Sequence, residues 1–235
     1  MALKKTNKAQ DPNSFMNTRR QILNKNSSFA VQEAYKSLRT NVRFFLQTKG
    51  CKRICITSAT AGEGKSITLL NLAISVAEAG QKVLLIDADL RRPALARLLV
   101  EKATPGLSNV LADLVSVEEV IRKDMYPNLD IIFSGDVPPN PSELLGGEKM
   151  QELIEKMSRK YDYILVDTPP VNMVSDACVI ANLLDGVLLL ARQGRSKKDE
   201  VKRAVANLRL TGAKLLGFVL NGAVLEGKKN YGYYG

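Results

Sequence analysis

Residues 53–66, RICITSATAGEGKS, place an apolar strand-like run directly before a glycine-rich turn and a lysine-serine pair. The last eight match GxxxxGK[ST], except that Ala59 stands where the first glycine is usual. An apolar-periodic stretch, Lys65–Ala79, follows and stops at Gly80, which predicts a helix. A strand, a small-residue loop and a helix in this order are typical of a phosphate-binding loop.

The residue types in this loop suit a nucleoside triphosphate. Glycines let backbone N–H groups close around phosphate oxygens, and the following helix N-terminus adds partial positive charge. Lys65 is predicted to reach the β- and γ-phosphates, and the Ser66 hydroxyl to ligate Mg²⁺. We therefore predict that the chain hydrolyses ATP or transfers its γ-phosphate.

The pattern outside the loop predicts an α/β fold with a mainly parallel sheet and helices on both faces. Continuous apolar runs alternate with helical periodicity, which favours a parallel sheet that is buried on both sides. The predicted strands are residues 53–58, 83–86, 129–133, 164–166, 186–191 and 215–221. The predicted helices are residues 29–47, 65–79, 147–160, 176–184 and 197–210, with short helices over 92–125.

Three aspartates follow predicted strands. Asp87 and Asp89 end one apolar run, and both point to one side if strand geometry persists that far. Asp167 ends another run and precedes Thr168-Pro169-Pro170, which turns the chain. An aspartate after an apolar strand is the Walker B pattern, in which the carboxylate holds Mg²⁺ directly or through water. Each could instead cap a helix, but three of them beside one phosphate loop favour a cation site.

Composition narrows the chemistry. The chain has no histidine, so proton transfer falls to carboxylates, lysine or tyrosine. Its three cysteines have no metal-ligand spacing and are predicted to be reduced. No apolar run is long enough to cross a bilayer and no secretory signal is recognisable, so a cytoplasmic location is expected.

The two ends differ from the middle, and they set the predicted boundaries. Residues 1–28 carry six basic side chains against one acidic, and are expected to form a flexible basic arm. The arm is open to three interpretations besides a solvated tail: an anionic membrane, an acidic partner, or DNA. The catalytic domain is predicted over residues 29–226, and residues 227–235, GKKNYGYYG, form a predicted flexible tail.

Five segments together resemble one known family, the bacterial P-loop tyrosine kinases of capsular and exopolysaccharide systems. They are SATAGEGKS (58–66), LLIDADLRRP (84–93), PPNPSELL (138–145), YDYILVDTPPV (161–171) and the terminal tyrosine cluster. The resemblance covers roughly residues 30–235. It implies a protein tyrosine kinase with ATP and Mg²⁺ as cofactors and protein tyrosines as substrates, and no nucleic-acid partner.

The resemblance also implies roles for individual residues. Lys65, Asp87 and Asp89 are implied to be catalytic, with one of the two aspartates as the base towards the tyrosine hydroxyl. Ser66, Asp87 and Asp167 are implied to organise the magnesium. The predicted ATP-binding residues are Ala61, Gly62, Glu63, Gly64, Lys65, Ser66, Ile67 and Asn221.

The tail is the predicted substrate. Tyr231, Tyr233 and Tyr234 are three of seven tyrosines in the chain, and a flexible small-residue segment can enter another subunit's site. A Gly/Tyr-rich end that is merely adhesive is the alternative. Asn221, at the end of the last predicted strand, is expected to meet adenine, although an asparagine before glycine also suits a turn.

Assembly is implied by the resemblance as well. The family's E-x-x-R-x-x-R pattern in the first helix is linked to ring formation, and here Glu33, Lys36 and Arg39 have that spacing. Lys36 keeps the charge but lacks the planar fork of arginine. A second departure is Ala61, where proline is usual. Short members of the family also depend on a separate membrane-bound activator protein.

The main alternative is a partition or division-site ATPase of the same superfamily. Those proteins carry a signature lysine early in the loop, in the form GKGGxGK[ST], and Thr60 has that position here. A nucleotide-binding adaptor without catalysis is the third possibility. The presence of Lys65, Ser66 and all three aspartates argues against it.

Overall fold

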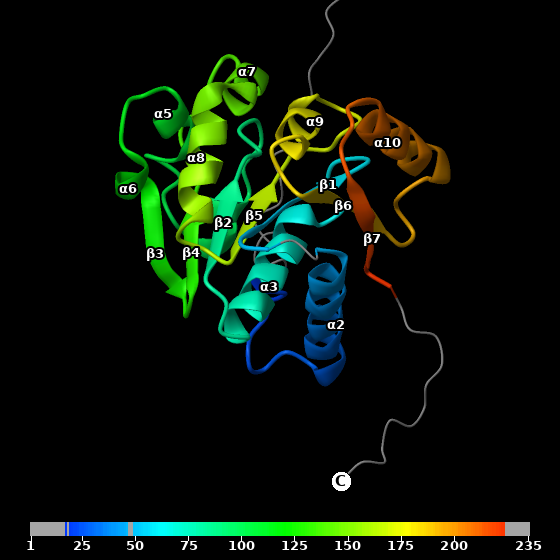
Figure 1. Ribbon diagram of the computed structural model, residues 1–235. Coiled ribbons are helices and arrows are strands. Elements are labelled where there is room, and N and C mark those ends of the chain that lie inside the picture. Colours follow the sequence, from blue (N-terminus) through cyan, green and yellow to red (C-terminus); the bar gives the residue numbers. More distant parts are fainter. Residues whose placement is uncertain (1–16, 18, 47–48, 224–235) are drawn as a thin grey trace, which may run out of the picture.

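The strands of the computed structural model form one seven-stranded sheet in the order β3-β4-β2-β5-β1-β6-β7 (Figure 1). The structure describes residues 17, 19–46 and 49–223 of the chain. All neighbouring strands run parallel except β3 and β4. The strands are β1 (Lys52–Ser58), β2 (Val83–Asp87), β3 (Ile121–Tyr126), β4 (Leu129–Ile132), β5 (Tyr163–Asp167), β6 (Gly186–Arg192) and β7 (Leu215–Asn221). The predicted α/β class and parallel sheet are confirmed.

Helices cover both faces of this sheet (Figure 1). The longer ones agree with the sequence prediction, and α9 ends three residues earlier than expected. They are α2 (Phe29–Phe45), α3 (Lys65–Glu78), α4 (Leu95–Leu99), α5 (Leu107–Leu111), α6 (Val117–Val120), α7 (Pro141–Gly146), α8 (Glu148–Ser158), α9 (Asp176–Ala181) and α10 (Lys198–Leu210). No helix in the described ranges is long and apolar enough to cross a membrane.

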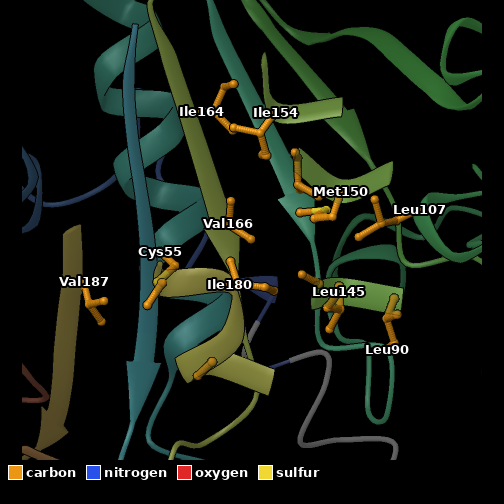
Figure 2. Close-up of a cluster of buried hydrophobic side chains, with 14 of the residues drawn as sticks. Cys55, Leu90, Leu107, Leu145, Met150, Ile154, Ile164, Val166, Ile180 and Val187 are labelled. Carbon is orange, nitrogen blue, oxygen red and sulfur yellow. The ribbon is translucent and has the colours of Figure 1, made fainter. Parts of the chain in front are cut away.

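Side chains of the central strands alternate between the two faces of the sheet and contribute to a separate hydrophobic cluster on each face. In β1, Cys55 packs towards α7, α8 and α9, whereas Ile54 and Ile56 pack towards α2 and α3. Figure 2 shows the first cluster, where Cys55 and Val166 from the sheet lie with Ile180 of α9 and other apolar side chains. Successive side chains of a strand point to opposite faces, so strands buried on both faces need continuous apolar sequences. This is why the apolar runs predicted the central strands well.

β3 corrects the sequence prediction. The sequence predicts only short helices over residues 92–125, but Ile121–Tyr126 form an antiparallel edge strand beside β4. Its centre is polar and exposed, and its register with β4 is interrupted between Arg122 and Tyr126. Charged, irregular edge strands resist pairing with other chains, and they lack the apolar run by which buried strands are recognised.

Part of the segment expected to be a basic arm packs onto the fold. Leu23 is buried, and its N–H donates to Asn71 Oδ1 of α3 at 2.8 Å. The Asn71 amide in turn donates to the carbonyl of Gln21 at 2.8 Å. The packed structure therefore extends N-terminally of α2, and residues 1–16 lie outside the described ranges.

Candidate functional site

The predicted phosphate loop connects β1 to α3 at the carboxyl edge of the sheet. Gly62 and Gly64 have φ values of 77° and 100°, in the left-handed region that favours glycine. Helix α3 begins at Lys65, which is buried, and Gly64 occupies its N-cap position without a side-chain cap. Within the described ranges, the N–H groups of Gly62, Glu63 and Gly64 donate to no protein acceptor. These free donors at a helix N-terminus fit an anionic ligand.

Glu63 braces the loop from inside. Its side chain is fully buried, and Oε1 accepts hydrogen bonds from the hydroxyls of Thr60, at 2.9 Å, and Ser196, at 2.6 Å. Ser196 lies in the loop between β6 and α10, a segment that the sequence did not single out. The Thr60 hydroxyl is thus engaged within its own loop, at the position where the partition ATPases carry their signature lysine.

Asp87 and Asp167 are neighbours across the sheet. They end β2 and β5 and are register partners in the parallel pair, so both carboxylates reach the edge that carries the phosphate loop. Both side chains are fully buried. Asp87 accepts hydrogen bonds from the N–H groups of Leu95, at 3.2 Å, and Asp89, at 3.3 Å.

Asp167 differs from Asp87 in its hydrogen bonding. Neither of its carboxylate oxygens has a hydrogen-bond partner that meets ordinary geometry among the described residues. Lys65 and the Ser66 hydroxyl are nevertheless close enough to lower its pKa. Buried carboxylates are normally satisfied, so an unpartnered one indicates a missing ligand. A divalent cation beside Asp167 and Ser66 would fill this role.

Burial raises the pKa of both carboxyl groups. The pKa of Asp87 is raised well above its ordinary value, first by burial and then by the charges of Asp167 and Asp89. The pKa of Asp167 is raised to about 6, chiefly by burial, with Lys65 and Ser66 opposing the shift. The two groups therefore resist carrying full negative charge together until a cation joins them.

The third aspartate is placed differently from the strand-based expectation. β2 ends at Asp87, so Asp89 lies in the following loop, where its Oδ1 accepts the N–H of Arg92 at 3.0 Å. Across the described residues, no three acidic, cysteine or histidine side chains converge into a metal-binding group. The expected acidic trio is therefore a register pair, Asp87 and Asp167, with Asp89 nearby. Magnesium commonly takes one or two protein carboxylates and fills its shell with phosphate oxygens and water.

The Asp89 loop is tied to two helices. Arg91 donates to both carboxylate oxygens of the buried Asp176, at 2.9 and 3.1 Å, and also to the Ser142 hydroxyl at 3.2 Å. The Ser142 hydroxyl itself donates to Asp176. Ser142 belongs to the PPNPSELL segment and is the second residue of α7, while Asp176 begins α9. The segment that the sequence singled out without a role therefore anchors the loop beside the carboxylates.

The remaining predicted site residues have these positions. Asn221 ends β7, and its amide donates to the backbone carbonyl of Glu63 at 2.8 Å. Glu33 and Lys36 form an ion pair of 2.7 Å on the surface of α2. Arg39 instead turns inward and donates to the carbonyl of Ser75 near the end of α3, at 2.6 Å. Tyr231, Tyr233 and Tyr234 lie outside the described residues.

The parallel sheet, the glycine loop before α3 and the strand-end carboxylates define a P-loop nucleotide-binding protein. A family model described as AAA domain matches residues 51–188. The tyrosine-protein kinase YwqD of Bacillus subtilis is 41% identical over 203 residues, which are 86% of each chain. The solved kinase domain of the Escherichia coli tyrosine kinase ETK matches with a TM-score of 0.80 and 37% identity, over 87% of this chain and 80% of that one.

The chain therefore belongs to the family of bacterial tyrosine-protein kinases, and its activity is that of a protein-tyrosine kinase. The cell division ATPase MinD of Pyrococcus furiosus has the same fold at a TM-score of 0.61 and 29% identity, over 72% of this chain and 71% of that one. The partition-type alternative thus shares the architecture. The kinases match over a larger part of the chain and more closely.

Proposed function

We propose that the chain transfers the γ-phosphate of ATP to Tyr231, Tyr233 and Tyr234 in the tail of a neighbouring subunit. The observation that carries the proposal is the unpartnered, buried carboxylate of Asp167 beside Lys65 and Ser66, at the edge where the free N–H groups of the phosphate loop lie. Such an arrangement suits a triphosphate with a divalent cation. Without a ligand, the buried carboxylate lacks the partners that buried polar groups normally have.

The residues of the site divide the work. Lys65 and the loop N–H groups bind and orient the phosphates, and Ser66, Asp167 and Asp87 hold Mg²⁺. When bound, the cation neutralises charge on the phosphate oxygens. Asp87 or Asp89 accepts the proton of the tyrosine hydroxyl, whose ordinary pKa near 10 requires a base at neutral pH. The pKa of Asp87 is raised in the ligand-free protein. Asp89 is also buried, but at 8% exposure against 0% for Asp87 it is the more accessible of the two.

The setting of this activity is part of the proposal. We place the enzyme in the cytoplasm, recruited to the membrane by a membrane-bound activator of a capsular or exopolysaccharide system, where phosphorylation regulates polymer synthesis or export. Subunits assemble into a ring, with α2 at the contacts. Glu33 and Lys36 are exposed and available for such contacts. Arg39 supports α2 against α3 within the subunit.

The test is incubation of the full chain with Mg-ATP, with and without an activating cytoplasmic segment, followed by mass spectrometry of the C-terminal peptide. We expect phosphate on the tail tyrosines and none in Lys65→Met, which should keep the fold. Lys197→Met, in the exposed N-cap of α10, serves as the matched control. Label on serine, or no label with any activator, contradicts the proposal.

A further inference from the structure

Three consecutive carbonyl groups of the phosphate loop contact side chains from the ends of β6 and β7 and from the segment after β6. Arg195 Nη2 donates to the carbonyl of Ala61 at 3.2 Å, and Arg192 Nη1 contacts that of Gly62 at 3.5 Å. Asn221 Nδ2 donates to the carbonyl of Glu63 at 2.8 Å. We call Arg192, Arg195 and Asn221 the carbonyl clamp.

The geometry of the peptide unit gives these contacts a consequence. In a trans peptide, the C=O and the following N–H point in opposite directions. The peptides that join residues 61–64 are trans, because the only cis bond in the described residues is Thr104-Pro105. Pulling the carbonyls of residues 61–63 towards the clamp therefore turns the N–H groups of Gly62, Glu63 and Gly64 away from it. These are the three donors that have no protein acceptor.

The clamp is itself a fixed unit. Arg192 and Asn221 are register partners in β6 and β7, and the N–H of Gln193 donates to the carbonyl of Asn221 at 2.9 Å. The Ser196 hydroxyl accepts the N–H of Arg192 at 2.7 Å and donates to Glu63 Oε1 at 2.6 Å. The clamp thus joins the phosphate loop to the sheet through backbone pairing and through a buried side chain.

The glycines of the loop fit this arrangement independently. A Cβ on Gly62 would lie 2.7 Å from Arg195 Nη2, and a Cβ on Gly64 would lie 2.3 Å from Asn221 Nδ2. The clamp side chains occupy the space that any other residue's side chain would need. The left-handed φ values require glycine at both positions. Close approach of Asn221 also disfavours a side chain at Gly64, whereas the exposed end of Arg195 can move away from one at Gly62.

We propose that Arg192, Arg195 and Asn221 are positioning residues that hold the three N–H donors of the phosphate loop in their binding orientation before the triphosphate arrives. Donors fixed in advance bind without reorganisation and select the polyphosphate group. This role rests on nucleotide binding by the loop and does not require that the tail tyrosines be the substrate. It assigns Asn221 to the phosphates rather than to adenine.

The decisive experiment compares ATP with inorganic triphosphate, which lacks the base. Calorimetry with Mg²⁺ measures both affinities for the full chain and for Asn221→Leu, an uncharged variant of similar size without the donor. We expect both affinities to fall by a similar factor, about 5- to 20-fold, as for a lost hydrogen bond. Asn221→Gln keeps the donor and should recover part of the loss. If only the ATP affinity falls, Asn221 reads adenine and the proposal is wrong for it.

A second set of variants, at Arg195, separates the effect of the hydrogen-bond donor from the effect of the charge. Replacing Arg195 with citrulline removes the charge but keeps an isosteric side chain with a terminal N–H donor for the Ala61 carbonyl, whereas Arg195→Met removes both. We expect the citrulline protein to bind inorganic triphosphate several-fold more tightly than Arg195→Met. Equal affinities would mean that Arg195 acts only through its charge, which overturns its place in the clamp. Arg203→Met on the surface of α10 controls for a lost cation, and thermal unfolding of each variant verifies that the fold is kept.

Discussion

The carboxylate of Asp167 lies at the end of β5 with both oxygens buried and unpartnered among the described residues. Its pKa is raised to about 6, so the folded protein without ligand holds this proton more tightly than the unfolded chain, in which an aspartate has a pKa near 3.9. The contribution of this group to stability is fully present below about pH 4 and is lost as the pH rises to about 6. Asp87 shifts in the same direction.

Asp167→Asn should therefore stabilise the ligand-free protein at pH 7 by about 1–3 kcal/mol, while it removes magnesium-dependent nucleotide binding. The gain should shrink towards zero near about pH 3, where the aspartate is mostly protonated in both the folded and the unfolded state. Chemical denaturation at the two pH values without nucleotide measures the difference. Asp199→Asn, on the exposed first turn of α10, is the matched control and should change little. Loss of stability in Asp167→Asn at pH 7 would contradict this account of the orphaned carboxylate.

At the scale of single elements, the loop after β2 depends on helices that are far away in sequence. Arg91 reaches Asp176 at the start of α9 and Ser142 at the start of α7, and the same loop carries Asp89. Asp176 is fully buried, while the Arg91 side chain is 39% exposed. The ion pair is partly screened by water on the arginine side only, so removing Arg91 leaves a buried charge without its partner.

Arg91→Met is expected to cost about 1–3 kcal/mol of unfolding free energy, less than a fully buried pair because the guanidinium is partly solvated. Its kcat should also fall by roughly an order of magnitude, since the Asp89 loop loses its anchor. Arg92→Met, on the neighbouring exposed arginine, should leave stability unchanged. Adding Asp176→Asn to Arg91→Met should restore part of the stability but not the activity. Full activity in Arg91→Met would rule out the anchoring role.

The strongest sequence signals belonged to elements buried on both sides. The apolar runs at β1, β2, β5 and β6 predicted the strands because the sheet is covered on both faces. The glycine loop and the aspartates that end β2 and β5 could be placed at one edge for the same reason. β3 was missed because a polar edge strand such as residues 121–126 has no such run.

Other parts of the site depend on contacts that no local pattern encodes. The bonds from Ser196, Arg192 and Arg195 to the phosphate loop join residues 130 to 134 positions apart in the chain. The inward turn of Arg39 depends on where α3 ends, so the E-x-x-R spacing alone could not reveal it. Ser142 was within a segment already singled out, but its partner Asp176 was visible only in three dimensions.

At the scale of the whole molecule, charge on the tail is expected to control assembly. Phosphorylation of Tyr231, Tyr233 and Tyr234 would add roughly −4.5 to −6 charges, because each phosphotyrosine carries about −1.5 to −2. Lys228 and Lys229 offset only part of this. A tail of that charge should be expelled from a site that contains Asp87, Asp89 and Asp167, and the oligomer should loosen.

The variant with all three tyrosines changed to glutamate should therefore dissociate at concentrations where the matched phenylalanine variant stays assembled. Sedimentation velocity at physiological salt measures both, and a second run at high salt should narrow the difference as charges are screened. Both variants keep the P-loop, so nucleotide affinity serves as the control for folding. Equal assembly of the two variants would show that tail charge does not govern the oligomer.

The alternation of side chains along the central strands links the packing of the core to the position of the catalytic aspartates. A single-residue insertion within β5 would exchange the side chains that face the two helical layers, and it would also carry Asp167 out of step with Asp87 across the sheet. A shift in strand register would thus disrupt both the hydrophobic core and the nucleotide-binding site. Lengthening is tolerable only in the turns, and inherited variation in chain length should accumulate there.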